Sequence, residues 1–252
     1  MLLKCLKGLE KESNGSIVLE GKTLKKRKDR LSSIALVFQD ASLEIVGSTV
    51  EKDIRFGLEN QKKSPEEINR ITDEILRRFN IEHLRKSSPR YLSGGEKRKV
   101  AIASVVAMEP KLVLLDEPLA NLDYPSTRLV LETIKYLKSE GVTIVIVSHE
   151  AEKLLSLTDR TIIMDKGSIV YDGESRESID ELRKADVFVP PLPFEELSWL
   201  WCFSQKEPRE IRSLHGSIHL QSCLDYWFSQ YSLHRITLSW WHHPCCSLQS
   251  LQ

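Results

Sequence analysis

The sequence predicts an α/β fold with a mostly parallel sheet. Two observations support this prediction: short apolar runs alternate with longer amphipathic runs, and serine or glycine stands where each amphipathic run begins or ends. Strands that alternate with helices form parallel sheets, whose ligand sites lie at the carboxyl ends of the strands. We therefore expect functional residues directly after the apolar runs.

Four short aliphatic or β-branched runs are typical of buried strands. They are Ile34–Phe38, Leu112–Leu115, Thr143–Val147 and Thr161–Met164. A fifth run, Ser16–Leu19, precedes a basic stretch from Lys22 to Arg30. We interpret that stretch as a solvated hairpin or loop, although an anionic partner is an alternative.

Three helices are predicted from their end signals. Ser64–Glu67 has serine at the cap, proline at the first position and glutamate three residues after the serine, so a helix begins there. Ser93–Glu96 repeats the capping pattern before a second helix. A third helix runs from about Ser126 to Glu140 and ends at Gly141.

Composition bounds the class of protein. The 252 residues include 36 Lys and Arg and 36 Asp and Glu, so the net charge is zero and gives no support for nucleic acid as a partner. No apolar run is long enough for a membrane-spanning helix. The length allows one α/β domain with an appendage.

The composition changes sharply near residue 186. Residues 187–252 hold only nine charged side chains, but all five Trp, four of the five Cys and five of the seven His. Three interpretations of the end of this segment remain open. His242–Cys246 could bind a metal, although adjacent cysteines do not match usual zinc sites. The segment could instead contact a membrane or a partner, or it is read out of frame and not selected to fold.

Polar residues follow two of the predicted strands. Leu112–Leu115 ends in Asp116 and Glu117; one carboxylate there suits Mg²⁺, and a second can orient or deprotonate a water that attacks a phosphate. Thr143–Val147 is followed by Ser148 and His149. We expect His149 to point towards the same crevice as Asp116.

Leu92–Glu96 carries a third signal. Two glycines at a helix start allow close approach of the backbone, and free N–H groups there form an anion site. The alternative is that Ser93 and Glu96 only cap the helix.

Together these residues resemble the ATP-binding subunits of ABC transporters. The motifs stand in the family's order: Gln39 for the Q-loop, Leu92–Glu96 for the signature, Leu112–Glu117 for Walker B, Asn121–Asp123 for the D-loop and His149 for the switch histidine. The resemblance covers roughly residues 1–195. It implies a P-loop NTPase-like ABC cassette over residues 1–186, with a helical subdomain at about 60–108. Residues 187–252 form a C-terminal extension that is family-like to about residue 200.

The resemblance also implies the cofactors ATP and Mg²⁺ and a role for each site residue. Asp116 holds Mg²⁺, Glu117 acts on the attacking water, and Gln39 and His149 sense the γ-phosphate and the metal. The residues implied to face the ATP of a partner domain are Ser93, Gly94, Gly95, Glu96 and Asp123.

Further segments are similar to the energy-coupling-factor ATPases, which energise uptake of vitamins or of cobalt and nickel ions. These segments are Val37–Asp40, Ile45–Glu51, Phe56–Gly57 and Gly94–Ile102, with Glu44 where that group usually has Gln. The implied partners are a second ABC ATPase subunit and a transmembrane component, near the Asp40–Gly57 region and the Ser64–Asn80 helix. The implied location is cytoplasmic, on the inner face of the membrane.

The family's phosphate-binding pattern, G-x-x-x-x-G-K-[ST], does not occur in the sequence. Met1–Leu9 resembles the helix that follows that loop, so we expect the first strand, the phosphate loop and an upstream aromatic to be missing. The two strands beside the first strand would then be separated by an unfilled slot, and the chain alone would be poorly stable and would not turn over ATP.

Three other hypotheses remain open. The chain lends its signature motif to an intact ATPase, or it is a degraded gene product without function. A non-transport ABC protein of translation or DNA repair is the last, although such proteins usually carry tandem cassettes or a coiled-coil insertion.

Overall fold

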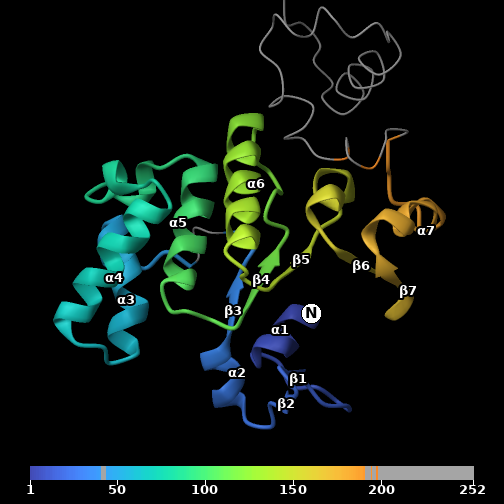
Figure 1. The fold of residues 1–252 in the computed structure, drawn as a ribbon, viewed down its shortest axis with the longest axis horizontal. Helices are drawn as coiled ribbons and strands as arrows, with labels where there is room; N and C mark the ends of the chain where they lie inside the picture. Colours follow the sequence, from blue (N-terminus) through green and yellow to red (C-terminus); the bar gives the residue numbers. More distant parts are fainter. Residues whose placement is uncertain (41–43, 191–193, 195–196, 198–252) are drawn as a thin grey trace, which may run out of the picture. The chain divides into compact units, whose positions relative to one another are not determined.

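The computed structural model describes residues 1–40, 44–190, 194 and 197 (Figure 1). Its strands are β1 (Val18–Leu19), β2 (Lys22–Thr23), β3 (Ile34–Val37), β4 (Leu112–Asp116), β5 (Ile144–Val147), β6 (Arg160–Asp165) and β7 (Ser168–Glu174). Its α-helices are α1 (Leu2–Lys7), α2 (Arg27–Ser33), α3 (Val50–Asn60), α4 (Pro65–Arg78), α5 (Gly94–Val106), α6 (Tyr124–Ser139) and α7 (Ile179–Lys184).

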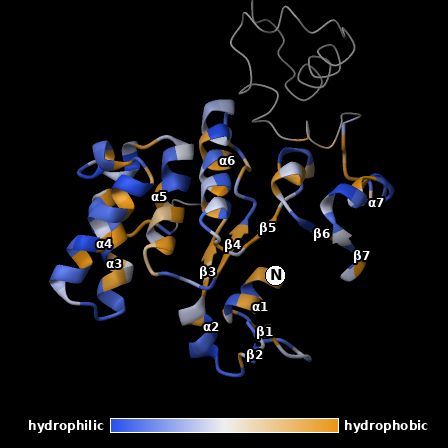
Figure 2. Ribbon diagram, in the orientation of Figure 1, coloured by the Kyte–Doolittle hydropathy of each residue, from blue (hydrophilic) through white to orange (hydrophobic). Residues whose placement is uncertain are grey.

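A parallel sheet of order β3-β4-β5 positions the candidate site. Val37 lies opposite Leu115, and Asp116 lies opposite Val147, so the three strands end at the same edge. Parallel sheets are usually covered on their faces, because the helices that connect their strands pack against them. Figure 2 shows β3, β4 and β5 as hydrophobic strands. The predicted α/β fold with a parallel sheet is confirmed.

Side chains on the two faces of this sheet belong to different apolar clusters. Alternate strand residues, including Leu36 and Leu114, pack with Leu3 of α1 on one face. Val37, Val113 and the other alternate residues join the larger cluster formed with α3, α4, α5 and α6. The helix predicted within Met1–Leu9 is therefore present as α1, and it covers one face of the sheet.

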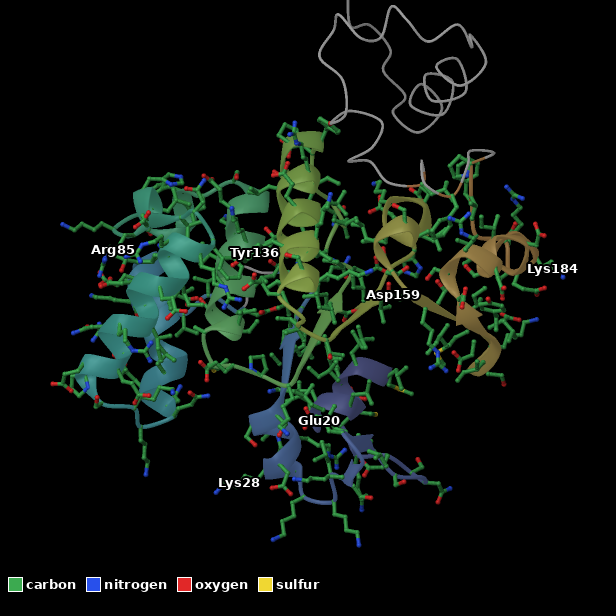
Figure 3. All side chains as sticks on the ribbon, viewed as in Figure 1. Glu20, Lys28, Arg85, Tyr136, Asp159 and Lys184 are labelled. Atoms are coloured by element: carbon green, nitrogen blue, oxygen red, sulfur yellow. The ribbon has the colours of Figure 1, made fainter. Side chains whose placement is uncertain are left out.

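Three of the helices that contribute to the larger cluster form a group, because α3 contacts both α4 and α5. Arg85 joins the group by ion pairs to Glu51 of α3, at 2.6 Å, and to Asp73 of α4, at 2.7 Å (Figure 3). Arg78 of α4 donates a hydrogen bond to the hydroxyl of Tyr136 on α6, at 2.7 Å. The predicted helical subdomain of about 60–108 contains α4 and α5, and α3 precedes it.

The predicted starts of the helices agree with the structure for two of the three helices. Ser64 and Ser93 each accept a hydrogen bond from the backbone N–H three residues later, at 3.2 Å. The third helix begins two residues before the predicted start, because Asp123 caps it by accepting from the N–H of Ser126. Aspartate followed by proline within the first turn was the signal for that start.

Two strands predicted to be buried are partly exposed. In β5, Val145 and Val147 are exposed, and in β6 only Ile163 is buried. Among the described residues, β5 pairs only with β4, and β6 pairs only with β7, in antiparallel fashion. A strand with one neighbour leaves part of its surface uncovered, so apolar composition alone overestimated burial here. The predicted cause, an absent first strand, remains a prediction.

The basic stretch from Lys22 to Arg30 is only partly the expected solvated hairpin. Its beginning forms β2, paired with β1, but its end forms α2. Arg30 is buried and donates hydrogen bonds to the carboxylate of Glu12 and to the carbonyl oxygen of Cys5. This arginine therefore fastens α2 to α1 and the chain that follows it.

The predictions for the end of the chain, including His242–Cys246, fall on residues 198–252 and lie outside the described residues. Over the part of the chain that the structure describes, no helix is both long enough and apolar enough to cross a bilayer.

Burial of the central strand predicts how strongly its side chains stabilise the fold. Leu115 of β4 is fully buried in the larger apolar cluster. We expect Leu115→Ala to lower the free energy of unfolding by about 2–5 kcal/mol, because it removes buried methyl groups and leaves a cavity. Val145→Ala on the exposed part of β5 is the matched control, with an expected loss of about 1 kcal/mol or less. Urea unfolding of both variants measures the difference, and equal losses would contradict the assignment of β4 as the central strand.

Candidate functional site

Three predicted site residues lie at the ends of adjacent strands or just after them. Gln39 comes two residues after β3, Asp116 is the last residue of β4, and His149 comes two residues after β5. The parallel register places these strand ends side by side. The structure therefore brings Gln39, Asp116, Glu117 and His149 to one edge of the sheet.

Glu117 and His149 contact each other at this edge. Nε2 of His149 lies 3.1 Å from Oε1 of Glu117, and the backbone N–H of His149 donates to Oε2 at 3.3 Å. The histidine side chain is 92% exposed, whereas the glutamate side chain is 11% exposed. Oε1 is buried and makes no well-formed hydrogen bond among the described residues, although Nε2 of His149 is near it. A carboxylate oxygen in this setting is suited to receive a proton or a hydrogen bond from a bound molecule.

Glu117 also has an unusual backbone conformation. Its φ of 45° lies in the left-handed region, which non-glycine residues seldom adopt. The backbone N–H of Glu117 donates to the carbonyl oxygen of Val147 at 2.8 Å, which holds the residue against β5. Such strain is concentrated at functional sites. Sequence analysis missed this feature, since no residue pattern near Glu117 encodes a positive φ.

The turn that begins α5 has its polar side chains paired with each other. The hydroxyl of Ser93 accepts from the N–H of Glu96 at 3.2 Å, and it donates to the Glu96 carboxylate at 2.8 Å. The backbone N–H of Ser93 donates to the same carboxylate, and these bonds lower the pKa of Glu96. Ser93 and Glu96 therefore cap the helix, as the simpler interpretation predicted.

Gly95 has a packing role that the sequence did not indicate. A Cβ at this position would lie 2.6 Å from Cα of Ser126, in the first turn of α6. Only glycine permits this approach, which sets the start of α5 directly against the start of α6. Asp123 caps α6 at the same place, and its hydrogen bonds from Ser126 lower its pKa. The structure thus joins two motifs that lie far apart in the sequence.

The sequence contains Gly-Lys-Thr once, at Gly21–Thr23. In a phosphate-binding loop this triplet would stand between a strand and a helix. Here it belongs to the turn and second strand of a hairpin, in which Lys22 pairs with Leu19. This triplet is therefore not a phosphate loop.

The residues at the strand ends fit part of a site for Mg²⁺ and a nucleotide. Asp116 and Gln39 supply the oxygen ligands that Mg²⁺ prefers, and Oε1 of Glu117, which makes no well-formed hydrogen bond among the described residues, can accept one. Among the described residues, no group of three or more His, Cys, Asp or Glu is placed to hold a metal ion. Mg²⁺ commonly needs only one or two carboxylates when substrate phosphates complete its coordination.

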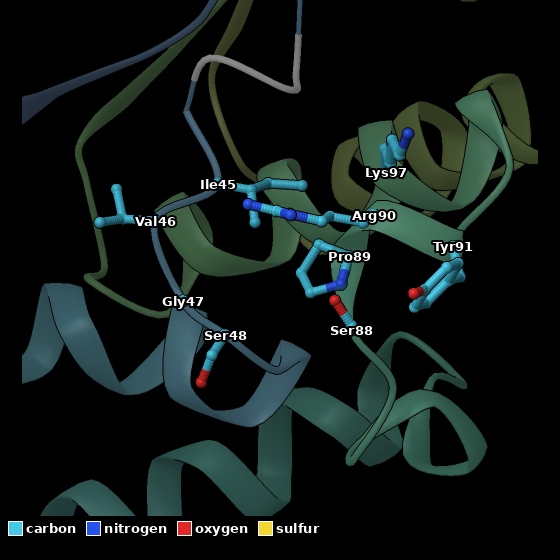
Figure 4. Close-up of a pocket in the computed structure, with 9 residues that line it drawn as sticks. All are labelled: Ile45, Val46, Gly47, Ser48, Ser88, Pro89, Arg90, Tyr91 and Lys97. Atoms are coloured by element: carbon cyan, nitrogen blue, oxygen red, sulfur yellow. The ribbon is translucent and has the colours of Figure 1, made fainter.

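A groove of about 770 Å³ lies between the chain entering α3 and the chain entering α5 (Figure 4). One wall is Ile45–Ser48, the other is Ser88–Tyr91, and Lys97 of α5 also lines it. Tyr91 and Val46 are strongly exposed. An exposed aromatic beside a groove is typical of a surface that binds a partner.

Comparisons with known proteins agree with this architecture. The family model described as ABC transporter matches residues 1–120. An energy-coupling factor transporter ATP-binding protein EcfA2 from Clostridium perfringens is 38% identical over 75% of this chain and 70% of the relative. Its counterpart from Clostridium tetani is 40% identical over 77% and 70%. The solved structure of cbiO1 from Clostridium perfringens, part of the ABC transporter complex cbiONQ, has a TM-score of 0.65 at 34% identity. It covers 73% of this chain and 77% of that one.

The raised pKa of Glu44 predicts how the stability of the fold depends on pH. Burial raises the pKa of its carboxyl to about 7, although the N–H of Phe38 donates to it. The folded state therefore holds this proton more tightly than the unfolded chain, and stability falls as pH rises from about 4.5 to about 7. Glu44→Gln removes this titration, so its unfolding free energy relative to the parent is expected to rise by roughly 3 kcal/mol across that range. Urea unfolding from pH 4.5 to 7.5 measures it, and parallel pH profiles would contradict it.

Proposed function

The chain belongs to the ABC transporter family, and on that premise we propose that it serves as an ATP-binding subunit of an energy-coupling-factor uptake transporter. The observation that carries the proposal is the contact between Glu117 and His149 at the ends of adjacent parallel strands. It is supported by relatives with that role, which match most of their own length to this chain.

In this proposal the strand-end residues act on ATP and its metal. Asp116 and Gln39 would hold Mg²⁺, and the Glu117 carboxylate, whose Oε1 is buried, would orient the attacking water or accept a proton from it. His149, whose side chain is exposed, would contact the terminal phosphate, and its contact with Glu117 would couple the phosphate to that carboxylate. ATP supplies the phosphoanhydride bond whose hydrolysis releases energy for transport.

The start of α5 contributes to a site completed by a second ATPase subunit. Ser93, Gly94 and Gly95 present a helix N-terminus, which attracts phosphate by its backbone N–H groups and dipole. Glu96 and Asp123 support this surface by capping α5 and α6. We place the ATP that it faces on the partner subunit, so the functional unit is a dimer.

The groove is proposed to receive the transmembrane component on the inner face of the membrane. Its walls include Ile45–Ser48, within the Asp40–Gly57 region that the family resemblance places near the membrane. Val46 and Tyr91 supply exposed apolar surface, and Arg90 and Lys97 supply positive charge at the same groove.

The chain by itself is proposed not to turn over ATP. The 252 residues contain no G-x-x-x-x-G-K-[ST], and the one Gly-Lys-Thr lies in a hairpin. The loop normally supplies several charge-assisted hydrogen bonds to phosphate, each contributing roughly 1.5–3 kcal/mol. As an alternative to ATP hydrolysis at its own strand ends, the chain would function through the phosphate loop of an intact partner, to which it would lend Ser93–Gly95.

Nucleotide affinity tests the missing phosphate loop directly. We expect the affinity of the purified chain for Mg-ATP to be several decades lower than that of the EcfA2 relative from Clostridium perfringens. Calorimetry on both proteins under the same conditions measures the two affinities. Micromolar affinity for this chain would show that other residues replace the loop.

A mixing experiment tests the contribution of Ser93–Gly95. Adding the chain to the Clostridium perfringens relative is expected to raise ATPase activity by roughly tenfold or more, because preorganised donors complete the partner's site. Ser93→Arg places a bulky cation in the turn and abolishes the increase, whereas Ser93→Thr keeps the cap and retains it. No increase, or an increase that survives Ser93→Arg, would contradict the proposal.

A further inference from the structure

Buried polar side chains hold both ends of the segment that runs from Gln39 to the groove. At the first end, Arg98 of α5 is only 3% exposed, and its guanidinium donates hydrogen bonds to the carbonyl oxygens of Phe38 and Gln39. Burying a guanidinium is costly unless its donors are used, so this residue is fixed to that stretch of backbone.

At the second end, Asp53 of α3 is 6% exposed. Its Oδ1 accepts from the backbone N–H groups of Val46, at 2.8 Å, and Gly47, at 3.0 Å. Its Oδ2 accepts from the hydroxyl of Ser104 on α5, at 2.7 Å. One carboxylate therefore ties the wall of the groove to both helices.

Gly47 permits this arrangement. A Cβ at position 47 would lie 2.3 Å from the backbone nitrogen of Asp53, a distance that side chains never adopt. The glycine lets the backbone of the groove wall sit directly on the first turn of α3. This close approach places both N–H groups on the carboxylate of Asp53.

The two ends are also connected through the segment itself. The carboxylate of Glu44 accepts from the backbone N–H of Phe38, so the residue just before the groove reaches back to the residue just before Gln39. Arg98 lies near this carboxylate and is attracted to it. The hydrogen bond between Phe38 and Glu44 links the residue just before the groove to the end of the strand that precedes Gln39.

Helix α5 is the element that these contacts share. It carries Arg98 and Ser104, it contributes Lys97 to the groove, and it begins at the Ser93–Gly95 turn. We propose that Arg98 and Asp53 are positioning residues: with Ser104 they form a clamp that makes a partner in the groove move Gln39 and the Ser93–Gly95 turn together. This inference rests on the proposed function and names the residues that regulate that same site.

Hydrogen exchange of the full chain tests the clamp without nucleotide or partner. Asp53→Ala is expected to speed exchange at Val46 and Gly47, where it removes the acceptor, and also at Phe38 at the far end. Arg98→Met is expected to have the reciprocal effect at Val46 and Gly47. Each increase should be roughly 10- to 100-fold, the size expected for loss of a hydrogen bond to a charged group.

Three variants separate positioning from general loss of structure. Arg98→Lys keeps the charge and one donor group and should restore part of the protection at the far end. Gly47→Ala leaves every buried charge in place, so it tests the same connection if Arg98→Met does not fold. Arg85→Met removes the ion pairs from residue 85 to Glu51 of α3 and to Asp73 of α4, and it is the matched control, with no expected change at Phe38, Val46 or Gly47.

The decisive result is exchange at the end remote from each substitution. Faster exchange there, with unchanged exchange in β4, supports the clamp. Exchange equal to the parent chain at the remote end in Asp53→Ala, Arg98→Met and Gly47→Ala would overturn it. In the mixing experiment, Arg98→Met and Asp53→Ala are expected to reduce stimulation of the relative. If the parent chain gives no stimulation, the proposed function fails while the exchange result still decides the clamp.

Discussion

The pairing of β4 between β3 and β5 is the constraint on which the candidate site depends. A parallel pair has a fixed register, so the residue that ends one strand determines which residues of the next strand lie beside it. Asp116 and Glu117 lie at the end of β4, beside the end of β5 that precedes His149. The backbone N–H of Glu117 donates to the carbonyl oxygen of the last residue of β5. Burial of β4 in both apolar clusters prevents that register from slipping.

Helix α5 is the second element on which the site depends. It lacks a strongly amphipathic pattern, because other elements cover it on several sides. Its buried residues are accordingly spread along most of its length. Its buried polar groups are consequently used for specific connections: Arg98 reaches the backbone of the two residues after β3, and Ser104 reaches Asp53 of α3. Its first turn is fixed against α6 by Gly95. One helix therefore relates the groove, the strand ends and the surface proposed to face a partner.

Two features of the described structure have different physical consequences. The hairpin position of Gly21–Thr23 concerns nucleotide affinity alone, because it leaves the strand ends in place. The single-sided pairing of β5 and β6 concerns stability and solubility, because exposed apolar strand residues such as Val145 and Ile162 favour association with other strands.

The sequence by itself determined the α/β class, the parallel strands and the capping of α4 and α5. Those features depend on local patterns: apolar runs, a serine before a helix, and a glutamate three residues later. It also placed Asp116, Glu117 and His149 after strands, so their common edge followed from the rule for parallel sheets. Glu117, Gly95 and Arg98 were different, because their roles depend on neighbours.

Only the tertiary structure decided those roles. The positive φ of Glu117 occurs where its backbone N–H bonds to β5. The need for glycine at position 95 follows from Ser126, and buried Arg98 donates to backbone carbonyl oxygens of Phe38 and Gln39. Each of these contacts joins residues far apart in the chain, and no local pattern encodes a contact that forms only when separate elements pack. The partial exposure of β5 and β6 has the same origin, since apolar composition shows that a strand can be buried but not which neighbours cover it.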